Sequence, residues 1–167
     1  MIHAASPPAA EPVQGFASPI DFEQTGRPVP AFAGASYGDA GAYEWLRGRV
    51  QGRVDLLHPL NRGIALIDMA PRDLQGWVNY GADIDILKPV DMRRGNGWLL
   101  YDVANRGNKR ALQRIDGGVA SNLPQRPEHT GVGYLLRRGF TLVWSAWQGD
   151  VTAGNERLCL DLSLIHI

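Results

Sequence analysis

The residues best placed for chemistry lie in a loop that follows an apolar strand-length segment. Residues 98–103 read WLLYDV, and the next seven residues, ANRGNKR, contain Gly107, which permits a sharp turn. Backbone N–H groups in such a turn can stabilise an oxyanion, because fixed dipoles need no reorganisation as charge develops. Asn105, Arg106 and Gly107 are therefore candidate oxyanion or substrate-binding residues. A tight strand-to-helix turn without a ligand is an equal alternative.

A second candidate loop follows the apolar run FTLVWSA at residues 140–146. It reads WQGDV, and in a parallel sheet such loops meet ligands at the carboxyl ends of strands. Trp147 and Gln148 are therefore candidate substrate-binding residues. Trp144 and Trp147 could together floor a ligand pocket, but Trp144 lies inside the apolar run and we expect it in the core. Trp147 lies past the end of the run, and both roles stay open for it.

One letter pattern resembles the nucleophile elbow of serine hydrolases. Residues 34–38, GASYG, fit G-x-S-x-G with Ser36 at the centre. The elbow needs a buried strand before it and a helix after it, whereas here Pro28 and Pro30 precede it and a further loop follows. We expect a Gly-rich turn rather than a catalytic serine.

Other titratable residues offer weaker candidates. Asp83 and Asp85 alternate to one face of a strand and could form a carboxylate pair, although we expect that face to be solvated. His58 and His129 lie beside prolines, so surface or capping roles are expected. The sequence has no paired metal-ligand spacing and no nucleotide-binding fingerprint. We therefore predict no metal site and no cofactor in this chain.

The composition limits the class of protein and of partner. The 167 residues, of 18.3 kDa, suit one domain, and 44% apolar with 20% charged residues exclude disorder over the whole length. Seventeen basic residues balance seventeen acidic ones, which disfavours nucleic acid as a partner. No apolar run approaches the eighteen or so residues of a membrane span. We expect a soluble protein, cytoplasmic or exported with a signal peptide absent from this sequence.

The periodicity along the chain predicts an α/β fold. Residues 1–30 are a Pro- and Ala-rich lead that we expect to be flexible. Alternating segments between residues 43 and 89 predict an antiparallel β meander. The order strand, loop, short helix, Gly, strand over residues 98–146 then predicts a parallel βαβ unit.

The last six residues, 162–167, have a separate origin in our interpretation. LSLIHI is what one reading frame of a widely used transposon sequencing adapter encodes, so we predict an adapter-derived tail. The alternative is an ordinary terminal strand.

Several blocks in order resemble the N-terminal part of the α/β-hydrolase-domain family of larger bacterial proteins. They are PAFAGASYGDAGAYEWLRG, ALIDMAPRDLQGWVNYGADIDILKP, GNGWLLYDVANRGNK and LRRGFTLVWSAWQGD, within residues 27–151. Ala146 departs from the pattern, where we expect Gly. The resemblance implies that residues 31–161 are the truncated N-terminal part of one α/β-hydrolase domain with an incomplete sheet.

The resemblance also implies an activity for the complete protein. It would be a serine-type hydrolase of carboxylic esters, with a small ester-like substrate. Asn105, Arg106 and Gly107 stand at the oxyanion loop, while the nucleophile, the acid and the His would follow beyond this sequence. This chain alone would then be inactive. The alternatives are a stand-alone β-rich binding module with a Trp platform, or a non-catalytic relative of the hydrolase fold.

Overall fold

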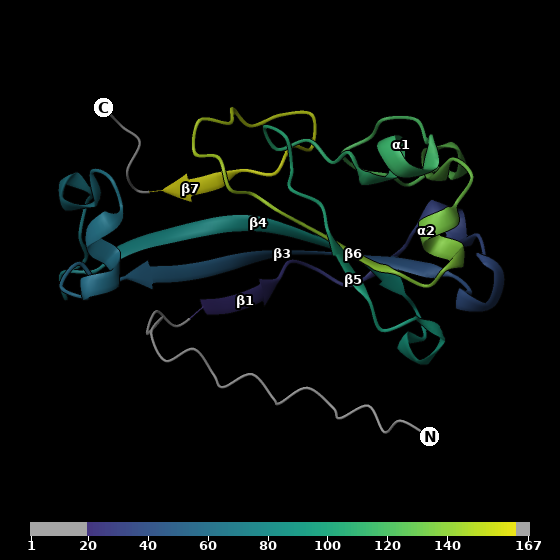
Figure 1. The fold of residues 1–167 in the computed structure, drawn as a ribbon, viewed down its shortest axis with the longest axis horizontal. Helices are drawn as coiled ribbons and strands as arrows, with labels where there is room; N and C mark the ends of the chain where they lie inside the picture. Colours follow the sequence, from purple (N-terminus) through teal and green to yellow (C-terminus); the bar gives the residue numbers. More distant parts are fainter. Residues whose placement is uncertain (1–19, 163–167) are drawn as a thin grey trace, which may run out of the picture.

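The computed structural model describes residues 20–162, which form one mixed β-sheet flanked by short helices (Figure 1). The order of the main strands across the sheet is β1-β3-β4-β6-β5, with β2 paired to β3 and β7 paired to β4. The strands are β1 (Ile20–Gln24), β2 (Val29–Pro30), β3 (Tyr43–Val54), β4 (Val78–Pro89), β5 (Leu99–Tyr101), β6 (Thr141–Ser145) and β7 (Leu160–Leu162).

A long antiparallel hairpin of β3 and β4 is the spine of the sheet. The two strands pair over their full length, from Tyr43 opposite Pro89 to Val54 opposite Val78. The period-two pattern near Ile84 and Leu87 thus predicts a strand where one exists. Gly48 fits here because a Cβ at that position would lie 2.2 Å from the Phe22 ring of β1.

The chain then crosses over the sheet to make a parallel pair. β5 pairs in parallel with β6, with Leu99 opposite Thr141, and the connection contains α1 (Ala111–Asp116), a 3₁₀ turn η6 (Pro127–Thr130) and α2 (Tyr134–Arg137). The other pairings among the described strands are antiparallel. Figure 1 shows α1 and α2 together at one end of the sheet.

The predicted fold class, an α/β fold forming the N-terminal portion of an α/β-hydrolase, is wrong. The described chain is β-rich, with α-helices of only six and four residues beside a seven-stranded sheet. Glycine explains why the helices are short. Gly117 ends α1 in the left-handed conformation, and α2 is confined between Gly133 and Gly139, both with positive φ. Helices of one or two turns cannot cover a sheet as a layer.

The predicted N-terminal lead, residues 1–30, and the predicted tail, residues 162–167, both overlap the residues that the structure describes. Residues 20–30 of the predicted lead contain β1 and β2, which pair with the outer side of β3. Leu162, the first residue of the predicted tail, is the last residue of β7 and pairs with Tyr80. Residues 1–19 and 163–167 lie outside the described residues.

The core lies between the sheet and the two helices. The rings of Trp45 and Trp144 stack with centroids 5.5 Å apart, and Trp144 is among the largest fully buried side chains. The Tyr43 hydroxyl lies 3.0 Å from the Leu136 carbonyl oxygen and 3.1 Å from the Phe140 carbonyl oxygen, which share its one proton. Burial raises the pKa of Tyr43. These contacts fasten α2 and the start of β6 to the hairpin.

Candidate functional site

The candidate oxyanion loop is a tight two-residue turn. Asn105 and Asn108 exchange both backbone hydrogen bonds at 3.0 Å, while Arg106 and Gly107 have φ values of 49° and 75°. Positive φ at both central residues is the geometry of a type I′ turn. The Asn108 side chain donates to the Asn105 carbonyl at 2.9 Å. We call residues 105–108 the turn from here on.

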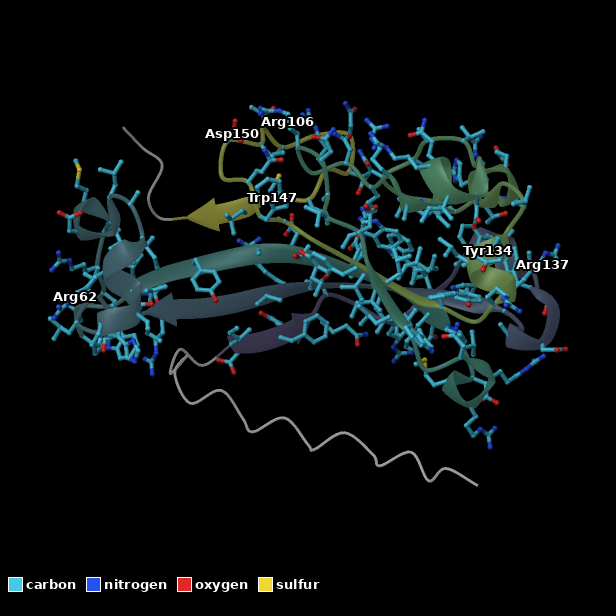
Figure 2. All side chains as sticks on the ribbon, viewed as in Figure 1. Arg62, Arg106, Tyr134, Arg137, Trp147 and Asp150 are labelled. Carbon is cyan, nitrogen blue, oxygen red and sulfur yellow. The ribbon has the colours of Figure 1, made fainter. Side chains whose placement is uncertain are left out.

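The loop after β6 packs against this turn. Gln148 Oε1 accepts a hydrogen bond from the Arg106 backbone N–H at 2.7 Å, and Trp147 Nε1 donates to the Ala104 carbonyl at 2.6 Å. The Arg106 guanidinium lies 2.9 Å from an Asp150 carboxylate oxygen. Figure 2 shows Arg106, Trp147 and Asp150 in one region of the surface. The five sequence-derived candidates, Asn105, Arg106, Gly107, Trp147 and Gln148, therefore form one cluster, which we call the turn cluster.

The hydrogen bonding within the turn cluster bears on the oxyanion hypothesis. An oxyanion hole needs N–H groups that point at the reacting oxygen and are free to bind it. The Arg106 N–H is occupied by Gln148 Oε1. In this arrangement the turn presents side chains, rather than a pair of free backbone donors, to a ligand.

Asp102, which the sequence analysis did not single out, anchors the start of the turn. Its Oδ2 accepts hydrogen bonds from the backbone N–H groups of Arg110 and Ala111, at 2.8 and 2.7 Å, and from Trp144 Nε1 at 2.5 Å. One carboxylate thus caps α1 and ties it to the core indole. An acidic residue directly after a strand, nine positions before the first residue of a helix, is the sequence signal that could have identified it.

A buried ion pair anchors the other end of the turn. Lys109 Nζ lies 2.7 Å from Asp85 Oδ2, and the two side chains are 2% and 4% exposed. The Lys109 ammonium also donates to the Asn122 carbonyl at 2.5 Å and lies 5.4 Å from the Trp45 ring centroid. Burial raises the pKa of Asp85 and lowers the pKa of Lys109, because each loses hydration of its charge.

The expectation that Asp83 and Asp85 lie on a solvated strand face is therefore wrong for Asp85. That face of β4 is covered, whereas Ile84 and Ile86 on the opposite face remain half-buried. Asp83 pairs with Arg49 at 3.0 Å and accepts the Cys159 N–H at 2.8 Å. The covering segments come from residues far along the chain, so alternation in β4 alone could not reveal them.

A charged cleft of about 310 Å³ opens beside the turn. Its charges are largely paired with one another: Arg47 lies 2.7 Å from Glu156 and 3.6 Å from Asp85. The turn joins the cleft through Gly107, whose carbonyl accepts the Leu158 N–H at 3.0 Å. A Cβ on Gly107 would lie 2.5 Å from the Leu158 carbonyl oxygen, so this close approach requires glycine.

The remaining sequence candidates have local roles. Ser36 is exposed between two 3₁₀ turns, η1 (Phe32–Gly34) and η2 (Gly38–Ala40), without the strand and helix of a nucleophile elbow. His58 Nδ1 accepts the Leu60 N–H and His129 Nδ1 accepts the Arg126 N–H, as capping predicts. Over residues 20–162, no three side chains of His, Cys, Asp or Glu are grouped as a metal site.

Comparisons with protein-family models, curated proteins and solved structures find no match to this chain. The resemblance to the α/β-hydrolase-domain family therefore stays a prediction. In the part of the chain that the structure describes, no helix has the length and apolar composition needed to cross a membrane. Fold and site together define a β-rich protein in which two loops, the turn and the 147–150 segment, meet at one end of a parallel strand pair.

Proposed function

We propose that this chain is a β-rich binding module that holds a small polar ligand against Trp147. The observation that carries the proposal is the state of that indole. Trp147 is 53% exposed, yet its Nε1 is fixed to the Ala104 carbonyl at 2.6 Å. A half-exposed ring held in one orientation presents a flat apolar surface with little conformational entropy left to lose on binding.

The groups around Trp147 indicate the chemistry of the ligand. Asn105 and Gln148 carry neutral amides, and Arg106 forms an ion pair with the neighbouring Asp150, so the turn cluster together with Asp150 has no net charge. Amides, guanidinium and carboxylate groups all form hydrogen bonds with hydroxyl groups. A neutral ligand with several hydroxyl groups and one apolar face, such as a sugar, suits this surface.

Two observations support binding over ester hydrolysis. The Arg106 N–H, a candidate oxyanion donor, is already bonded to Gln148. Ser36 lies exposed among 3₁₀ turns, and the two described histidines cap such turns through their Nδ1 atoms. The sequence-based prediction of a serine hydrolase rests on residues outside this chain.

To test the binding proposal, the purified chain is titrated with a panel of mono- and oligosaccharides, and each titration is monitored by heteronuclear NMR. We expect a sugar to shift the Trp147 indole N–H signal and the backbone signals of the turn. Trp147→Ala abolishes those shifts, whereas the matched control Trp98→Ala, which removes another exposed indole (70% exposed), leaves them unchanged. A panel without any response, or equal loss in both variants, contradicts the proposal.

An esterase assay distinguishes the enzyme alternative from the binding proposal. With p-nitrophenyl acetate we expect the wild-type chain and Ser36→Ala to give the same background rate. Hydrolysis above that background, lost in Ser36→Ala, would replace the binding proposal with a catalytic one.

A further inference from the structure

A second hollow lies between the start of β5 and helix α2, on a part of the molecule that the turn cluster does not use. It is an open depression of about 480 Å³, a volume within the size range of small-molecule sites. Figure 2 shows Tyr134 and Arg137 at this end. The side chains that matter for its chemistry are Arg94, Asn96, Trp98, Tyr134, Arg137 and Arg138.

The frame of this hollow is built by hydrogen bonds to Asn96. Its backbone N–H donates to the Gly139 carbonyl at 3.0 Å, and its side chain donates to the Arg138 carbonyl at 2.6 Å. The Asn96 Oδ1 accepts the Trp98 N–H at 2.8 Å. Gly139 has φ of 75°, and a Cβ there would lie 2.9 Å from the Asn96 nitrogen. The segment before β5 and the end of α2 are thus held together as one wall.

The charges in this hollow are unbalanced, unlike those of the charged cleft. Arg94, Arg137 and Arg138 line it, and none of them forms an ion pair with a residue in the range 20–162. Arg94 Nε donates to the Asp39 carbonyl at 2.6 Å, which orients the guanidinium and leaves its terminal nitrogens for other partners. Asp39 is the one acidic residue in the lining. An excess of positive charge therefore gathers here in a chain that is neutral as a whole.

Two exposed aromatic rings border these arginines. Trp98 is 70% exposed and Tyr134 is 51% exposed, and the Arg138 guanidinium lies 5.9 Å from the Tyr134 ring centroid. Covering an exposed indole removes apolar surface from water, which is favourable. A planar ring stacked on Trp98 would cover it, and an anionic group on that ring would meet the arginines.

We propose that this hollow binds an anion carried on a planar ring, of the nucleoside monophosphate class. The phosphate accepts hydrogen bonds from Arg94 and Arg137, since planar guanidinium groups match phosphate oxygens in pairs. The base stacks on the exposed ring of Trp98, a residue whose backbone N–H is held by Asn96 Oδ1. This site is independent of the turn cluster and of the function proposed for it.

Calorimetric titration with adenosine monophosphate, adenosine and inorganic phosphate tests the proposal. We expect the monophosphate to bind at least about tenfold more tightly than adenosine or inorganic phosphate alone. We also expect its affinity to fall as the salt concentration is raised. Equal affinity for inorganic phosphate would overturn the role of the ring. Equal affinity for adenosine, or no binding of the monophosphate at all, would overturn the anion site.

Matched variants locate the site. Arg137→Gln weakens binding of the monophosphate about tenfold, whereas Arg62→Gln has no effect, since Arg62 is another exposed arginine at the opposite end of the molecule (Figure 2). Trp98→Ala also weakens binding of the monophosphate, and Trp147→Ala does not. Because Trp98 and Arg137 are both exposed, the variants keep the fold, which circular dichroism verifies. Equal affinities in Arg137→Gln and Arg62→Gln would place the ligand elsewhere and refute the proposal.

Discussion

Replacing Lys109 with Met is predicted to destabilise the fold severely. The substitution keeps most of the apolar stem but leaves the Asp85 carboxylate, 4% exposed, without the ammonium 2.7 Å away. Breaking a buried pair in this way costs about 3–5 kcal/mol, because an uncompensated charge stays in the interior. The Arg47 Nε atom at 3.6 Å offsets part of that cost, so we expect the lower end, about 3 kcal/mol.

Urea unfolding followed by circular dichroism at neutral pH measures this loss. With an m-value of about 2 kcal/mol per molar urea, the midpoint falls by about 1.5 M. Lys88→Met is the matched control, since Lys88 pairs with Glu44 where both side chains are about one-fifth exposed. Such a pair contributes about 1 kcal/mol or less to the free energy of unfolding.

A double substitution separates the unpaired charge from simple loss of packing. Asp85→Leu combined with Lys109→Met removes both charges, and we expect it to be more stable than Lys109→Met alone. The reasoning is refuted if Lys109→Met costs no more than Lys88→Met, or if the double variant is less stable than the single one. In the first case Asp85 would be neutral or hydrated in the folded chain.

Two further predictions concern the loop after β3 and the packing of α1. Hydrogen bonds from the Trp77 and Gln75 backbone N–H groups lower the pKa of Asp73 from its ordinary value of 3.8, so its stabilisation is present above that value and is lost as the pH falls through the lower folded-state pKa. The melting temperatures of the wild type and of Asp73→Asn should therefore differ at pH 6 and converge in strong acid. A difference in melting temperature that stays constant with pH would contradict this. Gly131→Ala should cost about 3 kcal/mol or more, because φ is +55° and a Cβ would lie 1.9 Å from the Asp116 carbonyl oxygen. Gly63→Ala, with nothing within 4 Å, should change the melting temperature little, and similar melts for both variants would refute the steric argument.

Local patterns in the sequence predicted much of the local structure. Alternation identified β4, because successive side chains of a strand point to opposite faces. The continuous apolar run at residues 140–146 identified β6, which is buried at three consecutive residues. Gly107 marked the sharp turn, since positive φ favours that residue type. Trp144, inside the apolar run, is in the core, while Trp147, beyond it, is half-exposed.

Two features became visible only in the tertiary structure: the short helices that make the protein β-rich, and the covered face of the sheet. The same glycines that mark turns also shorten α1 and α2, and only their lengths show that a β-rich protein results. Asp85 is buried because Lys109, 24 positions further along the chain, reaches it across β4 and neutralises its charge. The meeting of Arg106 with Gln148 likewise depends on β5 and β6 lying side by side. Periodicity describes one element at a time, whereas these contacts join groups whose separation in sequence carries no local signal.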